Sequence, residues 1–292
     1  MLTIDPKTGD FKELYGHLTG SVGPRPIAFA STIDEEGNPN LSPFSYFNVF
    51  SANPPILVFS PVLRGRDGSK KHTLQNVEAT REAVVNIVNY SMVQQMSLSS
   101  TEYDDDIDEF VKSGLTKVKS DLVKPFRVKE SPVQFECKVN DIMALGDSGG
   151  AGSLIICEVV KMHIDENILD ADDNIDQYKI DQVARMGGNW YTRANKGLFE
   201  VPKPLQKKGM GVDAIPEDIR TSKILSGNDL GKLGNVEQLP GEREILAFVE
   251  KNAKLTKVSS SDLHKEAQKL LEKDKPLEAW KVLLLSKKDL KA

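Results

Sequence analysis

The feature that most constrains the fold is a set of three short apolar runs, separated by turn residues, between residues 25 and 60. Asp34–Pro39 has the composition of a hairpin connection, and Ser51–Pro55 ends one run before the next begins. Short apolar runs between turn signals are typical of β-strands. The segment therefore predicts consecutive strands in a β-rich core.

The first of these runs is apolar on both faces. Ile27, Phe29 and Ile33 share one face of an extended chain, while Ala28 and Ala30 lie on the other. A strand that is apolar on both faces is covered on both sides. In a small all-β core this pattern indicates a barrel interior on one side and a further layer or a second subunit on the other.

Composition excludes several classes of protein. The 292 residues are 39% hydrophobic and 28% charged, as in an ordinary soluble globular protein. The formal charge of −5 argues against a general nucleic-acid binder, and no apolar stretch has the length of a membrane span. Met1–Asp5 runs into polar residues without the apolar core of a signal peptide, so we expect a cytoplasmic protein. Cys137 and Cys157 stand inside apolar runs and are expected to be buried thiols.

Local patterns predict the elements that follow. Asp67 or Ser69 is expected to cap a helix that buries Leu74 and Val77, and Ser91–Gln94 fits a capping box at the start of another helix. Further expected elements are a helix at residues 10–18 and strands at residues 82–88, 133–145 and 153–164.

Two segments resemble ligand loops but are interpreted otherwise. Gly146–Gly152 lacks the spacing of a dinucleotide-binding loop and precedes a strand, so we expect a hairpin loop that could still border a ligand. Glu102–Glu109 holds six acidic residues but lacks the regular oxygen spacing and central glycine of a cation loop, which favours a solvated helix start. The four histidines show no metal-ligand spacing and no nucleophile motif is present, so we predict no metal site and assign no catalytic residue.

The character of the chain changes towards its C-terminus. Residues 242–252, 260–273 and 276–285 carry helical periodicity, with Ser260 or Ser261 available as a cap, and Ser226–Gly234 has the composition of an irregular joint. We therefore predict a first domain at residues 1–225 and a helical extension at residues 226–292.

An ordered series of short motifs runs from about residue 10 to residue 205. They are Pro24–Ala28, Ser31–Thr32, Gly37, Asn40–Phe47, Pro54–Pro55 with Ser60, Lys71–Thr73, Ser100–Tyr103, Ser131–Cys137 and Arg185–Tyr191. The series resembles the flavin reductase-like family, the FMN-binding split barrels, and within it the flavoredoxin-like branch. The resemblance implies a mainly β split barrel with peripheral helices, which binds FMN at a homodimer interface.

Residues 64–73 have the composition of an anion site. They supply cations and hydroxyls beside a helix start, whose free N–H groups favour an anion. Taken alone, the segment fits a solvated basic turn equally well. The resemblance favours the flavin phosphate, with Lys71 and Thr73 best placed and Arg64 beside them. Many members of the branch have Asp where this chain has His72, so we assign His72 no catalytic role.

The strand after the first hairpin supplies groups for the flavin ring. Pro43 removes one ladder donor, so this strand is expected to bulge or to lie at a sheet edge, which frees backbone groups for a ligand. The resemblance adds Ser60, Arg185 and Tyr191, the last of which also suits packing. The expected flavin contacts within the strand are Ser42, Pro43, Phe44, Ser45, Tyr46 and Asn48.

The resemblance implies flavin-dependent oxidoreduction. We expect NAD(P)H to reduce the flavin, which passes electrons to an acceptor that the sequence does not identify. Two alternatives stay open. One is a flavoredoxin-like electron carrier reduced by a partner protein, and the other is a non-enzymatic flavin-binding module whose helical tail contacts another protein. Direct nicotinamide turnover separates the first function from both alternatives.

Overall fold

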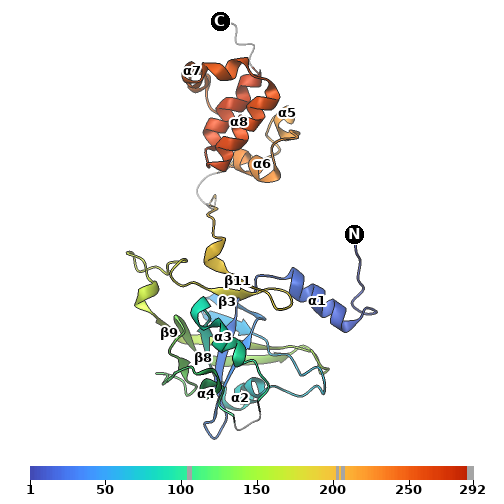
Figure 1. Ribbon diagram of the computed structural model, residues 1–292, viewed down its shortest axis with the longest axis vertical. Coiled ribbons are helices and arrows are strands. Elements are labelled where there is room, and N and C mark those ends of the chain that lie inside the picture. Colours follow the sequence, from blue (N-terminus) through green and yellow to red (C-terminus); the bar gives the residue numbers. More distant parts are fainter. Residues whose placement is uncertain (104–106, 202–203, 205–207, 288–292) are drawn as a thin grey trace. The chain divides into compact units, whose positions relative to one another are not determined.

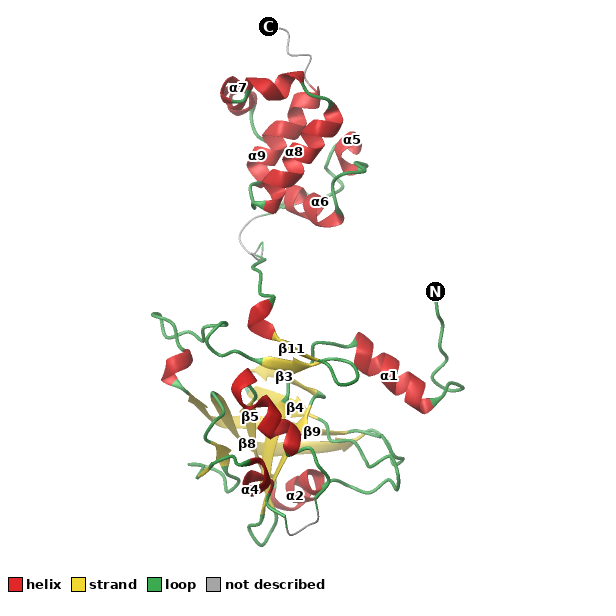
Figure 2. Cartoon of the chain, in the orientation of Figure 1, coloured by secondary structure: helices red, strands yellow, loops and turns green. Residues whose placement is uncertain are grey.

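The computed structural model describes residues 1–103, 107–201, 204 and 208–287. Its contacts divide the chain into two compact units, Met1–Phe199 and Glu200–Ala292 (Figures 1 and 2). Each unit has a hydrophobic core of its own. We call them the barrel unit and the helical unit.

The barrel unit is built on one seven-stranded antiparallel sheet with the strand order β2-β1-β5-β8-β9-β4-β3. The two edge strands, β2 and β3, are joined by Ser45 and Tyr46 alone, so the sheet curls until its edges meet at that corner. Phe44 and Phe59 pack against each other across the enclosed space, with ring centroids 5.5 Å apart. The strands are β1 (Ala28–Ile33), β2 (Pro39–Phe44), β3 (Phe47–Ala52), β4 (Pro55–Phe59), β5 (Glu82–Ile87), β8 (Val133–Ala144) and β9 (Ser153–Ile164).

Strand β1 is buried along its whole length, as its apolar pattern predicts. Ala28 and Ala30 belong to the cluster inside the barrel, while Phe29 belongs to a second cluster with Met96 and Phe110. Successive side chains of a strand point to opposite faces, so β1 separates the barrel interior from an outer layer of helices. The prediction of a strand covered on both sides is confirmed.

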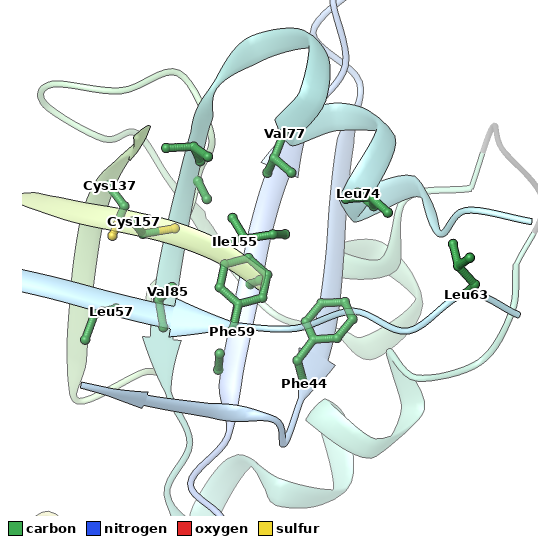
Figure 3. Close-up of a cluster of buried hydrophobic side chains, with 14 residues drawn as sticks. Phe44, Leu57, Phe59, Leu63, Leu74, Val77, Val85, Cys137, Ile155 and Cys157 are labelled. Atoms are coloured by element: carbon green, nitrogen blue, oxygen red, sulfur yellow. The ribbon is translucent and has the colours of Figure 1, made fainter. Parts of the chain in front are cut away.

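The inner cluster fills the space within the sheet (Figure 3). Leu74 and Val77 reach it from helix α2, and Cys137 and Cys157 lie side by side in it. Both predictions, the buried helix face and the buried thiols, are confirmed. The neighbouring Cys157 thiol and burial raise the pKa of Cys137 well above its usual range, so the thiol stays protonated.

Short helices and two small hairpins surround the sheet. The helix expected at residues 10–18 is present as α1, and Asp10 caps it by accepting from the N–H of Glu13 at 2.9 Å. The predicted capping box at Ser91 is wrong, because the Ser91 hydroxyl donates to Asn89 and a short 3₁₀ turn precedes the helix. The helices are α1 (Phe11–Ser21), α2 (His72–Thr80), α3 (Val93–Leu98) and α4 (Glu109–Ser113), the 3₁₀ turns Tyr90–Met92, Glu166–Ile168 and Ala194–Lys196, and the hairpins β6 (Lys117–Val118) with β7 (Arg127–Val128) and β10 (Val183–Arg185) with β11 (Tyr191–Arg193).

The helical unit packs around Trp280, which is fully buried and donates its indole N–H to the carbonyl of Leu233 at 3.0 Å. No helix among the described residues is long and apolar enough to cross a membrane. The unit contains α5 (Glu217–Arg220), α6 (Gly227–Gly234), α7 (Glu242–Lys251), α8 (Ser260–Glu272) and α9 (Pro276–Leu283), with 3₁₀ turns at Ala253–Lys257 and Leu284–Lys287.

The structure does not divide the chain at the predicted boundary after residue 225. Ile219 and Leu225 are buried in the core of the helical unit, so the unit begins before them. The expected irregular joint at Ser226–Gly234 is helix α6, because Ser226 and Asp229 form a capping box. The cap of α8 is likewise Ser259, one residue before the predicted pair.

Candidate functional site

Four of the predicted site residues line one narrow hollow of about 40 Å³ at the start of α2. Ser42 comes from β2, Arg64 from the loop after β4, and Lys71 and Thr73 from the first residues of the helix. The fold therefore brings together the basic segment and the strand that sequence patterns assigned to one ligand.

The N-terminus of α2 has no side-chain cap. Lys71 occupies the cap position and makes no capping hydrogen bond. Neither of the predicted caps, Asp67 or Ser69, caps the helix. Asp67 instead accepts from the backbone N–H and the hydroxyl of Ser69 at 2.9 and 2.6 Å, and these bonds lower the pKa of Asp67 to about 2. First-turn N–H groups lack intrahelical acceptors, and the helix dipole favours an anion beside them.

The ammonium group of Lys71 lies 5.7 Å from the centre of the Phe44 ring. No carboxylate or carbonyl oxygen within the described ranges accepts a hydrogen bond from it. Burial lowers the pKa of Lys71, while the carboxylate of Glu102 acts in the opposite direction. A partly buried cation without an acceptor is stabilised by an anion, because charge-assisted hydrogen bonds offset its desolvation.

Arg64 is bound by its own loop and by a distant carboxylate. Its guanidinium donates to the carbonyl of Lys70 and lies 3.3 Å from the hydroxyl of Ser69. Its Nε also lies 3.3 Å from Oε1 of Glu102, which is 38 residues away in the sequence. The guanidinium is thereby held at the edge of the hollow.

The hydroxyl of Thr73 is not available to donate to a ligand. Thr73 is only 1% exposed, and its hydroxyl donates to Oδ1 of Asn40 at 2.7 Å. The amide of Asn40 donates to Glu109 at 2.8 Å, and the N–H of Leu41 donates to the same carboxylate at 3.1 Å. Since a hydroxyl carries one hydrogen, the expected Thr73 side-chain contact with a phosphate is replaced by a buried network. Burial raises the pKa of Glu109, and the two hydrogen bonds oppose this.

The corner between β2 and β3 forms a second group. The buried guanidinium of Arg25 donates to carbonyls of α1 and the loop after it, and to the carbonyl of Met186 at 3.0 Å. Its Nε lies 3.5 Å from the hydroxyl of Ser45. Tyr46 lines a larger, mainly apolar hollow of about 390 Å³, whose other wall is α1. Sequence patterns assigned Ser45 and Tyr46 to the ligand but gave no role to Arg25.

The remaining residues of this strand lie in different surroundings. Pro43 stands on the edge strand β2, which confirms one of its two expected positions. Phe44 is buried in the inner core rather than in a ligand wall. Asn48 is exposed on β3 and accepts from the N–H of Val49 at 2.8 Å. Ser60 is buried against the glycine-rich hairpin loop between β8 and β9.

Arg185 and Tyr191 lie on the hairpin β10–β11, which adjoins the corner, because the backbones of Arg185 and Arg25 exchange two hydrogen bonds of 2.8 and 2.9 Å. The Arg185 guanidinium lies 4.6 Å from the centre of the Tyr191 ring, and the two residues are paired across the hairpin. Tyr191 also lines a hollow of about 220 Å³ with Tyr90, whose ring lies 4.0 Å from the Arg193 guanidinium. Within the described part of one chain, this hairpin and the hollow at α2 have no lining residue in common.

Asp121, Glu136 and His163 hold potential metal ligand atoms within 4.8 Å of one another. The carboxylate of Glu136 already accepts from the N–H groups of Asp121 and Leu122 at 2.8 and 2.6 Å, and lies 2.7 Å from the His163 ring. These contacts satisfy both oxygens, so we assign the cluster a structural role.

Several lining residues of the hollow at α2 were missed in the sequence. Ser100, Thr101 and Glu102 line it, and their motif was noted only as part of a resemblance. The run of hydroxyl side chains after α3 was the available signal. Of the acidic run, residues 104–106 lie outside the described residues, while Asp108 caps α4 by accepting from the N–H of Phe110 at 2.9 Å. The expected helix start is confirmed, but it is not solvated throughout, because Glu109 is buried and accepts from Asn40 and Leu41.

Comparison with known proteins relates the barrel unit to one family. Residues 21–179 match the sequence profile described as "Flavin reductase like domain". An uncharacterized protein of Halalkalibacterium halodurans is 34% identical over 205 residues, which are 70% of this chain and 97% of that protein.

Two solved structures support the same relationship. Nitrilotriacetate monooxygenase component B from Bacillus cereus has 32% sequence identity and a TM-score of 0.64, covering 69% of this chain and 98% of its own. The 2-nitrobenzoate 2-nitroreductase of Pseudomonas fluorescens has 27% identity and a TM-score of 0.61, covering 71% of this chain and 100% of its own.

Proposed function

Because this chain belongs to the flavin reductase-like family, we propose that its barrel unit binds FMN and passes electrons from NAD(P)H through it to a further acceptor. The family match supports a flavin-using oxidoreductase. FMN, the nicotinamide donor and the residues that bind them are our proposal.

The hollow at the start of α2 is the observation that carries the proposal. It combines the uncapped helix N-terminus with the ammonium of Lys71, which has no hydrogen-bond acceptor among the described residues. Arg64 and the hydroxyls of Ser42, Ser100 and Thr101 stand around it. This donor set suits a terminal phosphate, which FMN has and riboflavin lacks. Thr73 would contribute its backbone N–H, since its hydroxyl is engaged by Asn40.

The apolar hollow beside Tyr46 is our candidate for the flavin ring. Ser42, in the phosphate hollow, precedes Tyr46 by four residues of mostly extended chain, which span at most about 13 Å. Ser45 and the backbone of the β2–β3 corner would bind the polar edge of the ring. A bound flavin supplies hydride and electron transfer, while the protein binds and orients it.

We propose a homodimer, because the edge strand β3 exposes large apolar side chains. Val49 is 63% exposed and Phe50 is 68% exposed. A second copy would cover them and bring further groups, such as Arg185, Tyr191 or Asn48, to the ring of its neighbour. Sedimentation of the wild type and of Phe50→Asp tests this part, and a wild-type monomer would contradict it.

The experiment for the main proposal is the purification of the protein, an absorption spectrum, and identification of the released flavin by mass. Titration of the flavin-free protein should show tighter binding of FMN than of riboflavin or FAD. NADH and NADPH oxidation is then measured with a dye as acceptor. A correctly folded protein without affinity for any flavin would contradict the proposal.

One alternative keeps the flavin but changes the electron donor. The helical unit has its own core and lies outside the family match, which suits contact with another protein. Under this alternative the protein is an electron carrier that a partner reduces. Rapid turnover with NADH or NADPH alone would exclude it.

A further inference from the structure

Among the described residues, Glu102 and Glu109 are the two carboxylates that line the phosphate hollow, and the proposed function uses neither. Glu109 is engaged by Asn40 and by the N–H of Leu41, whereas Glu102 faces the basic segment. Its Oε1 lies 3.3 Å from Nε of Arg64, and its Oε2 lies 3.5 Å from Nη1 of Arg66. Both arginines belong to the segment that we assign to the phosphate. The two carboxylate oxygens thus satisfy the donors that phosphate oxygens would otherwise satisfy.

The lining groups of the hollow differ in how firmly they are held. Thr73 is fixed by its bond to Asn40, and Ser42 belongs to a strand. Glu102 has a side chain that is 53% exposed and is held by ion pairs at the surface. Such pairs are weak, so Glu102 is the lining group that can move aside.

We propose that Glu102 competes with the flavin phosphate for Arg64 and Arg66, and that this competition makes the flavin an exchangeable ligand. The inference rests on the proposed function. Binding of the phosphate displaces the carboxylate from the two arginines, and the nearby negative charge continues to oppose the anion. Lys71 remains available to hold the phosphate, because none of the described residues accepts a hydrogen bond from it.

The test is the variant Glu102→Gln, which removes the charge and keeps the size. We expect its Kd for FMN to fall about 5- to 10-fold, since an exposed charge pair is screened but a phosphate carries nearly two charges. Release of FMN should slow in proportion, and the Kd for riboflavin should not change. Glu102→Asp keeps the charge and should retain most of the competition.

Glu78→Gln is the matched control. Glu78 pairs at 2.7 Å with Lys70, which belongs to the same basic segment as Arg64 and Arg66. Glu78 does not line the hollow, so removal of its charge should leave FMN affinity unchanged. Circular dichroism and thermal unfolding establish that each variant is folded.

Three results for a folded Glu102→Gln protein would overturn the inference. The first is an unchanged affinity for FMN, and the second is a weaker affinity, which would mean that Glu102 orients the arginines. The third is a rise in riboflavin affinity as large as the rise in FMN affinity. If the wild type binds no flavin, the proposed function fails separately. Calorimetry with inorganic phosphate and pyrophosphate then decides the competition: tighter binding to Glu102→Gln supports it, and equal or absent binding ends it.

Discussion

The contacts that stabilise the barrel unit internally differ in kind from those that stabilise the helical unit internally. In the barrel unit, residues far apart in the sequence meet, as when Asn40 binds Glu109 or β1 pairs with β5. In the helical unit, most of the packing joins helices that are close in the sequence, such as α8 and α9. The hollow beside α2, which we propose as the phosphate site, is one such meeting point, with lining residues from β2, the loop after β4, the start of α2 and the loop after α3.

The units also differ in charge. Residues 1–199 contain 28 acidic and 20 basic residues, whereas residues 200–292 contain 15 acidic and 18 basic residues. An anion site in the acidic unit cannot depend on a general positive field. The site that we propose would depend on local groups, namely the N-terminus of α2 and Lys71, and we expect it to be sensitive to single substitutions.

Among the changes that test the difference between the two units, truncation of the helical unit should have the largest effect on stability. A fragment of residues 200–292 should unfold cooperatively, while a fragment of residues 226–292 should not, because it lacks the buried side chains Ile215, Ile219 and Leu225. At about 1.5–3 kcal/mol each, their loss approaches the whole stability of a small domain. Denaturant unfolding followed by circular dichroism measures both. Equal stability would restore the boundary predicted from sequence.

A core substitution in the helical unit should come next. Trp280→Ala should destabilise this unit by about 3–5 kcal/mol, because it leaves a large cavity and an unpaired Leu233 carbonyl. Flavin affinity should remain unchanged. Leu277→Ala on the same helix is the control, since Leu277 is 52% exposed and should cost little. Loss of flavin binding in Trp280→Ala would show that the two units are not independent.

A substitution in the barrel unit tests where the ligand binds. Lys71→Ala should weaken FMN binding about 10- to 100-fold, the value of one charge-assisted hydrogen bond, and should leave riboflavin binding nearly unchanged. Lys70→Ala is the matched control, because the Lys70 ammonium is already paired with Glu78. Equal losses for FMN and riboflavin would mean that Lys71 supports the fold and not the phosphate.

The smallest expected difference is in pH dependence. Burial lowers the pKa of His264 in the helical unit, with Asp218 opposing. A lowered histidine pKa stabilises the fold above about pH 6.5, its unfolded value, and this stability is lost as the pH falls from there towards the folded pKa. In the barrel unit, burial alone would raise the pKa of Glu136. The hydrogen bonds from Asp121 and Leu122 outweigh this effect, so the pKa of Glu136 is lower than its usual value. The stability that ionised Glu136 contributes to the barrel unit is therefore lost only as the pH falls below about 4.5, the pKa of an unfolded glutamate.

Between pH 7 and pH 5 the helical unit should therefore lose stability before the barrel unit does. The variant Trp190→Phe leaves Trp280 as the one tryptophan, so its fluorescence follows the helical unit. His264→Gln should remove the dependence in this range. A pH profile that is the same with and without His264 would contradict the assignment.

Much of the fold was determined by local sequence patterns. The two-sided apolar run at Ala28–Ile33 predicted a barrel wall, and the spacing of Leu74 and Val77 predicted the buried face of α2. The order of short motifs predicted the family, which the comparisons confirm. These features can be predicted because the periodicity of a strand or a helix repeats within a few residues. The apolar positions of one short segment therefore indicate which face of that segment is buried.

The site was decided largely by tertiary structure. Sequence placed Thr73 at the phosphate, but the fold gives its hydroxyl to Asn40 and the Asn40 amide to Glu109, 69 residues away. Sequence likewise could not place Glu102 on Arg64, nor show that residues before Ser226 complete the helical core. Hydrogen bonds and packing between distant segments depend on where the backbone brings single atoms, and local periodicity carries no information about that.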